Sequence, residues 1–132
     1  MILVDTSVWI DLFRDRKTPP TTHLRNLLDE GGEFGVTPVI VQEILQGAAD
    51  VREFMLLNDY FSSQRMLTPE DPLRTHCQAA RLYFDCRRRG FTPRSTIDCF
   101  IAQIALEHRV PLLHADRDFE RIAKVAPQLK FV

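Results

Sequence analysis

The sequence has 132 residues, of which 45% are hydrophobic and 27% are charged. This is enough for one globular domain with a sizeable core and too little for two. Its apolar runs are far shorter than the roughly 18 to 20 residues that cross a bilayer, and the N-terminus lacks the basic stretch and cleavage site of a signal peptide. We therefore expect a single soluble, cytoplasmic domain over residues 1–132.

The charge and the cysteines exclude further classes of protein. A net charge of −1 gives no general surplus of cations for binding phosphates. The arginines are nevertheless concentrated in one short region, at Arg81, Arg87, Arg88, Arg89 and Arg94. Three cysteines without CxxC spacing indicate neither a disulfide framework nor a zinc site, and we expect buried packing roles for Cys77, Cys86 and Cys99.

The predicted elements alternate between strands and helices. A continuous apolar run at residues 1–4 predicts a buried strand, and polar helix-start residues then precede an amphipathic segment in which Trp9 and Phe13 face the core. Further helices are expected at 21–30, 38–46, 50–62, 71–89, 95–108 and 117–125, and further strands at 34–37, 66–67, 111–114 and 129–132. This alternation predicts a three-layer α/β/α fold with a central, mainly parallel sheet of four to five strands.

Three aspartates lie at helix starts near the predicted sheet edge. Ligands of open parallel sheets bind beyond the carboxyl ends of the strands, where Asp5 and Asp116 lie. Asp is also a favoured N-cap residue, and a helix follows both positions, so a structural role fits either one alone equally well. Asp98 lies three residues after Ser95, in a pattern that resembles a capping box and favours a structural role for this residue alone.

Glu43 is the acid that a structural role explains least. At 100° per residue it lies between Val39 and Ile40 on the apolar face of its helix, and Glu is almost never fully buried without a partner. If it meets the three aspartates at the sheet edge, these charges raise one another's pKa unless a cation is present. An all-carboxylate site selects Mg²⁺ or Mn²⁺, and such an ion can activate water for hydrolysis of a nucleic-acid backbone.

Three ordered motifs, together with Glu43, resemble those of the PIN domain. The motifs read MILVDTSVW from residue 1, STIDCFIA from residue 95 and LLHADRDF from residue 112. The similarity covers essentially the whole chain and is greatest to the VapC branch, the toxins of VapBC toxin–antitoxin systems. It implies a magnesium-dependent endoribonuclease in which Mn²⁺ can replace Mg²⁺. The substrate would be a structured or tRNA-like RNA, and cleavage would leave a 5′-phosphate and a 3′-hydroxyl. The catalytic and metal-binding residues that it implies are Asp5, Glu43, Asp98 and Asp116.

The resemblance also implies accessory residues. Thr6 would hold the first acid or a water molecule in place, while Asp118 would be an accessory acid, a helix cap or a surface charge. His114 stands where many relatives have threonine, and a hydrogen-bonded histidine at a strand end is the simpler interpretation. Our hypothesis for substrate binding is the group of arginines at the end of the long helix, Arg87, Arg88 and Arg89. Solvated cations that favour the C-terminal dipole of that helix are an equally good interpretation.

The partners implied are a second copy of the chain and a VapB-like antitoxin. In this family the antitoxin wraps a helical hairpin, which here would cover residues 38–62. That segment carries more apolar side chains than one helix face needs, at Phe54, Met55, Leu56, Leu57, Tyr60 and Phe61. DNA would be bound only through the antitoxin.

Three other functions remain open on the sequence alone. A signalling receiver or a haloacid-dehalogenase-type phosphotransferase also places aspartates at the edge of a parallel sheet, but residues 5–8 lack the second Asp of a DxDx[TV] loop and no lysine follows a suitable strand. A nuclease fold used only for binding within a repressor complex is disfavoured by four intact acids. A PIN nuclease of RNA processing or flap cleavage usually carries extra domains.

Overall fold

Four short parallel strands form the centre of the fold. In the computed structural model, which describes residues 1–132, their spatial order is β3-β2-β1-β4. Their bounds are β1 Ile2–Val4, β2 Phe34–Val36, β3 Arg65–Met66 and β4 Leu112–Leu113. The central strand β1 pairs through Leu3 with Gly35 on one side and Leu112 on the other. The parallel sheet is therefore confirmed, and its strands end at a common edge.

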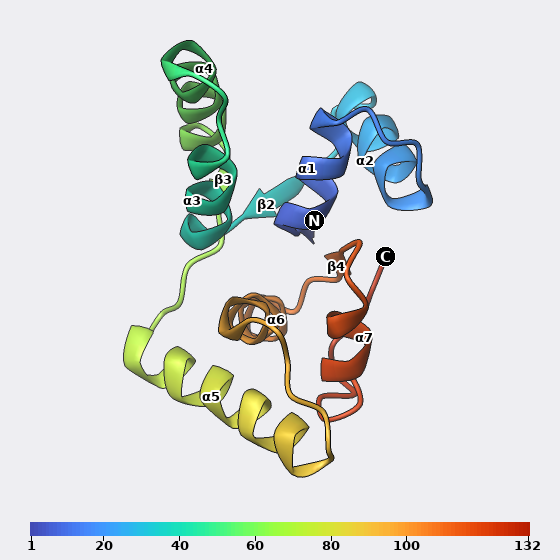
Figure 1. Ribbon diagram of the computed structural model, residues 1–132, viewed down its shortest axis with the longest axis vertical. Coiled ribbons are helices and arrows are strands. Elements are labelled where there is room, and N and C mark those ends of the chain that lie inside the picture. Colours follow the sequence, from blue (N-terminus) through green and yellow to red (C-terminus); the bar gives the residue numbers. More distant parts are fainter.

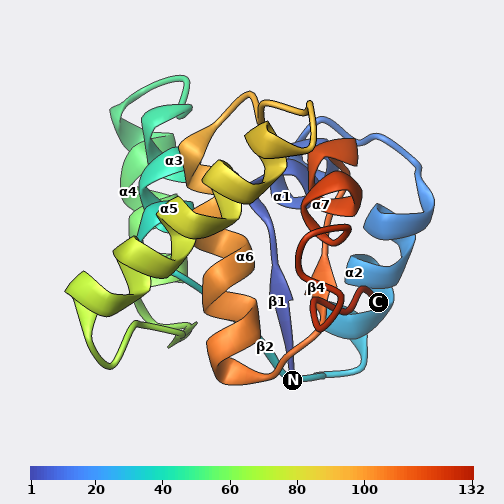
Figure 2. The ribbon, with the colours of Figure 1, turned by 90° about the horizontal axis from the view of Figure 1, so that it is seen from below.

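Seven helices cover the sheet. Their bounds are α1 Thr6–Phe13, α2 Pro19–Asp29, α3 Pro38–Gln46, α4 Val51–Ser62, α5 Pro72–Arg88, α6 Thr96–His108 and α7 Arg117–Ile122. Helices α1 to α4 lie on one side of the sheet and α5 to α7 on the other, and α6 lies between the sheet and α5 (Figure 1). Figure 2 shows β1 rising between these layers toward the ends of α1 and α7. The three-layer α/β/α prediction is confirmed. No helix has the length and apolar character needed to cross a membrane.

The core is built from the strands and the helix faces that cover them. Leu3, Val4 and Leu112 are completely buried, as the continuous apolar runs of a sheet covered on both faces require. The Trp9 ring is 1% exposed and packs edge-on against Phe61, with ring centroids 4.9 Å apart. Burial of each such large apolar side chain contributes about 1.5 to 3 kcal/mol, so this contact stabilises the packing of α1 against α4.

Several sequence predictions need correction. The predicted strand at 129–132 is wrong, because only Phe131 makes a bridge to Leu112 at the sheet edge. Helix α2 begins two residues early, since Thr18 caps it and Pro19 is tolerated in a first turn. Helix α7 ends at Ile122, after which the chain continues in turns. Two burial predictions also fail, because the Phe13 side chain is 51% exposed and Cys77 is exposed.

Candidate metal centre

Two of the predicted acids lie where neighbouring parallel strands end. Asp5 follows β1, is 4% exposed and caps α1 by accepting a hydrogen bond from the Ser7 backbone N–H at 3.0 Å. Asp116 follows β4 and caps α7 in the same way, through the Asp118 N–H at 3.0 Å. The capping role and the site role therefore coexist. Each cap uses one oxygen of the carboxylate, Oδ2 of Asp5 or Oδ1 of Asp116, and so leaves the second outside the cap.

Asp98 comes from the other side of the sheet edge and has no capping function. Ser95 caps α6 by accepting from the Ile97 N–H at 3.1 Å, but the reciprocal bond of a capping box is not formed. The half-buried Asp98 side chain is left without a hydrogen-bond partner in the first turn of α6. The structural role that the sequence pattern favoured for Asp98 is therefore not what the geometry shows.

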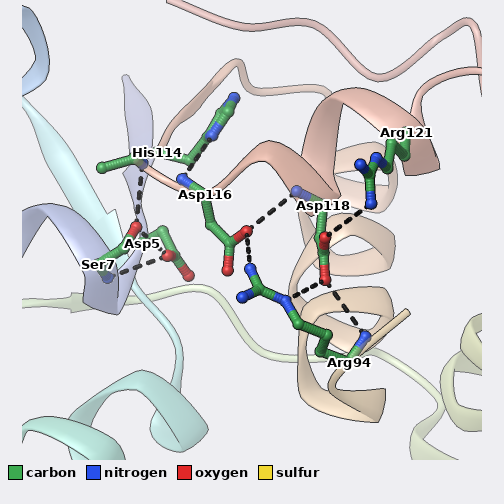
Figure 3. Close-up of polar contacts among 8 residues, drawn as sticks. Asp5, Ser7, Arg94, His114, Asp116, Asp118 and Arg121 are labelled. Atoms are coloured by element: carbon green, nitrogen blue, oxygen red, sulfur yellow. Dashed lines mark hydrogen bonds and ion pairs between the residues drawn. The ribbon is translucent and has the colours of Figure 1, made fainter. Parts of the chain in front are cut away.

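Glu43 reaches the cluster from α3 and is held by a threonine. It is half-buried on α3, one and a half turns after Thr37 caps that helix. Its Oε1 accepts a hydrogen bond of 2.7 Å from the Thr6 hydroxyl. Thr6 thus orients the second acid rather than the first. Asp5 is instead held by Ser7, whose hydroxyl donates to Asp5 Oδ2 and accepts from the Ala115 N–H at 3.0 Å (Figure 3). The sequence analysis gave Ser7 no role beyond starting a helix.

The carboxylates are close enough to influence one another's ionisation. One oxygen each of Asp98, Asp116 and Asp118 lies within 4.8 Å of the others. Burial, followed by the charges of Asp5 and Asp116, raises the pKa of Asp98 to about 7. Burial also raises the pKa of Asp5 to about 6, with a smaller contribution from Glu43 and partial opposition from the Ser7 hydrogen bonds. Burial is the largest cause of both shifts, and the neighbouring carboxylates add to it.

These residues fit a divalent cation of the hard class. The donor set consists of carboxylate oxygens alone, without the histidine or thiolate ligands that favour zinc or copper. Asp98 has no hydrogen-bond partner, and a bound cation would favour the charged forms of Asp98 and Asp5 that burial disfavours. The geometry therefore suits a metal ligated by oxygen.

Asp118 is already engaged by two arginines. It is 1% exposed, and its Oδ2 accepts from both the backbone N–H and Nε of Arg94, each at 3.2 Å. Its Oδ1 lies 3.8 Å from Nη1 of Arg121. Arg94 also donates from Nη2 to Asp116 Oδ1 at 2.8 Å, so one guanidinium bridges two acids (Figure 3). Sequence reasoning placed Arg94 only in a diffuse arginine cluster, because the loop that brings it to the acids has no pattern of its own.

The three arginines predicted to bind substrate lie apart from these contacts. The guanidinium carbons of Arg87 and Arg88 lie 5.7 and 5.8 Å from the centre of the Phe84 ring. Arg89 donates to the Lys124 carbonyl at 2.8 Å. They form hydrogen bonds or ion pairs with none of the clustered acids. His114 accepts a hydrogen bond from the Asp116 N–H at 3.2 Å, and burial lowers its pKa.

The main apolar cavity lies beside the acids rather than among them. It measures about 660 Å³ and is bordered by α3, α5 and the first turn of α6. Ile97 and Cys99, the neighbours of Asp98 in sequence, line it, but none of the clustered carboxylates does. The cavity is therefore separate from the acidic cluster.

Comparison with known proteins agrees with this fold. A family profile described as PIN domain matches residues 2–125. The chain is 35% identical over 126 residues to VapC ribonuclease Mb1587 of Mycobacterium bovis and to ribonuclease VapC11 of Mycobacterium tuberculosis, covering 95% of this chain and 93% of each relative. The crystal structure of FitAcB from Neisseria gonorrhoeae aligns with 100% of this chain and 97% of its own, with a TM-score of 0.59 and 18% identity, which shows a shared fold.

The parallel sheet and its acidic edge define an α/β domain of the PIN class. With a profile match over nearly its whole length and full-length relatives at 35% identity, the chain belongs to the PIN-domain family and, within it, to the VapC ribonuclease toxins.

Proposed function

We propose that this chain is a Mg²⁺-dependent endoribonuclease, the toxin of a toxin–antitoxin pair, which acts in the cytoplasm on a structured or tRNA-like RNA. The observation that carries the proposal is the convergence of carboxylates on the carboxyl edge of the sheet, where one oxygen each of Asp98, Asp116 and Asp118 lies within 4.8 Å of the others and Asp98 has no hydrogen-bond partner. The full-length similarity to VapC ribonucleases supports RNA as the substrate.

The four predicted acids are proposed to hold the ion. Asp5, Glu43, Asp98 and Asp116 would ligate Mg²⁺, or Mn²⁺ in its place. A bound ion of this kind makes water more acidic and stabilises charge that develops on a phosphodiester.

The protein's own contribution is to fix the positions of these ligands. Ser7 ties Asp5 to the loop after β4, and Thr6 fixes Glu43. Rigid placement of this kind removes the cost of reorganising the carboxylates during the reaction.

The ends of the RNA fragments test hydrolysis by water. Attack by water on the phosphodiester is expected to leave a 5′-phosphate and a 3′-hydroxyl. Fragments made by the purified chain from total RNA should therefore be joined directly by a ligase that requires a 5′-phosphate. Cyclic 2′,3′-phosphate ends would instead mean that the RNA's own 2′-hydroxyl attacks, and the proposed chemistry would be wrong.

We further propose that a VapB-like antitoxin covers the hairpin of α3 and α4. Several apolar side chains on α4 face solvent in the isolated chain, with exposed fractions of 60% for Met55, 62% for Leu56 and 44% for Phe54. An amphipathic helix of a partner would bury this surface. The chain is proposed to act as a homodimer within that complex and to reach DNA only through the antitoxin.

Hydrogen exchange tests the antitoxin surface. Amides of residues 51–62 should exchange more slowly, by about tenfold or more, when the antitoxin is bound, because the partner suppresses opening of α4. Helix α2 serves as the internal reference, since it lies outside the proposed hairpin. Protection elsewhere with unchanged exchange in α4 would place the antitoxin on another surface.

A further inference from the structure

Arg94 presents an unused hydrogen-bonding edge at the acidic site. Its Nε and Nη2, which form one edge of the guanidinium, bond to Asp118 and Asp116. An arginine carries five N–H donors, and these two bonds leave both donors on Nη1 and one on Nη2 free. The side chain is 74% exposed, so the free edge faces solvent.

The guanidinium is held more rigidly than its exposure suggests. The backbone N–H of Arg94 and its Nε both donate to the same oxygen of the buried Asp118. A long side chain in solvent normally loses rotamer entropy when it binds a ligand. Here the ion pairs with Asp118 and Asp116 restrict the side chain before any ligand binds.

Asp118 is paired with cations of the protein itself. Both of its oxygens face cations, Arg94 on one side and Arg121 on the other. Arg121 is itself positioned by stacking, with its guanidinium carbon 4.7 Å from the centre of the Phe91 ring. The charge of Asp118 is thus compensated within the protein, whereas Asp98 has no such partner.

We propose that Arg94 binds a phosphate of the RNA next to the bond that is cleaved, and that Asp118 is its positioning residue. The inference rests on the proposed ribonuclease function. The free Nη1–Nη2 edge matches the two oxygens of a phosphodiester, the geometry in which arginine binds phosphate most strongly. On a chain with a net charge of −1, a cation bridged to two site acids also relieves the repulsion between RNA and the carboxylates.

The test compares RNA binding and cleavage by Arg94→Ala, Arg94→Lys and Asp118→Asn. Affinity for a fluorescein-labelled oligouridylate is measured by anisotropy in Ca²⁺ over a series of salt concentrations, and cleavage of total RNA is measured in Mg²⁺. Arg94→Ala is expected to weaken binding about 10- to 100-fold and to reduce the slope of log K against log [salt] by about 0.7, the share of one phosphate contact. Asp118→Asn should weaken binding with little change in that slope, because the cation is kept but misplaced.

Controls separate this role from a structural one. Arg25→Ala removes another exposed arginine that bonds an aspartate, Asp15 at 2.7 Å, and should leave affinity and slope unchanged. Arg94→Lys keeps the charge without the bidentate edge and should restore the slope but not the full affinity. Circular dichroism checks that each variant is folded.

Three outcomes would overturn the proposal. If Arg94→Ala binds and cuts RNA as well as wild type, Arg94 does not contact substrate, although the nuclease function stands. If Arg94→Ala binds RNA or Mn²⁺ more tightly and cuts faster, Arg94 blocks the site instead of serving it. If wild-type protein itself cuts no RNA under any condition, the proposed function has failed, and this inference fails with it.

Discussion

Replacing Asp98 with Asn should lower kcat/KM for RNA cleavage by about 10³-fold or more while leaving the protein folded. Asn preserves the shape of the side chain but removes the negative charge, and Asp98 is the clustered acid with no hydrogen-bond partner of its own. Loss of one electrostatic group that stabilises a transition state costs about 10²- to 10³-fold, and loss of a metal ligand adds reduced metal affinity. Steady-state cleavage of an RNA recovered from the total-RNA digest measures the effect.

Asp29→Asn is the matched control for this substitution. Asp29 is an exposed aspartate at the end of α2 that forms no side-chain hydrogen bond or ion pair, so the same chemical change there should alter activity less than about twofold. Equal activity of Asp98→Asn and Asp29→Asn would exclude Asp98 from the site.

The ion-free protein should become more stable as the pH falls from about 7.5 to about 5.5. The folded-state pKa values of Asp98 and Asp5, about 7 and about 6, lie above the ordinary value of 3.8, so the folded state binds more protons than the unfolded state in this window. The stability present at low pH is therefore lost as the pH rises through about 6 and 7. His114 opposes the trend, because its lowered pKa favours protonation of the unfolded state near pH 6.

Metal should reverse this dependence. At a concentration about 100 times its Kd, Mn²⁺ or Mg²⁺ should add about 2.7 kcal/mol to the free energy of unfolding at pH 7.5. Each kcal/mol corresponds to roughly 3 to 5 °C in Tm. The gain should be smaller at pH 5.5, where the carboxylates are protonated. Thermal unfolding with chelator and with each ion, at both pH values, measures the effect. Asp98→Asn should flatten both responses. A Tm that is unaffected by these ions would contradict a metal centre at this edge.

Much of the fold follows from local pattern. The apolar run before Asp5 and the Thr37–Pro38 start of α3 are strong signals, and both elements formed as predicted. The predicted last strand failed for a non-local reason. It meets the two-residue edge strand β4, and a single bridge from Phe131 is all that forms.

The convergence of acids on the sheet edge was predictable, but the residues that hold them were not. The ends of predicted strands, and a glutamate on an apolar helix face such as Glu43, can both be recognised from the periodicity of hydrophobic residues. Whether Asp98 completes a capping box, and whether Thr6 turns to Asp5 or to Glu43, depends on side-chain rotamers and on neighbours far along the chain. The contact of Arg94 with Asp118 spans 24 residues through a loop without periodic pattern, so no local rule reveals it.

The decisive experiment for a metal-dependent ribonuclease is cleavage of total cellular RNA by antitoxin-free wild-type protein, compared with cleavage by Asp5→Asn. The reactions contain Mg²⁺, Mn²⁺ or a chelator. Wild type should give discrete fragments with either ion and none with the chelator, and the variant should give none under any condition. Fragments that persist in the chelator, or equal inactivity of the two folded proteins with both ions present, would contradict a metal-dependent ribonuclease built on these acids.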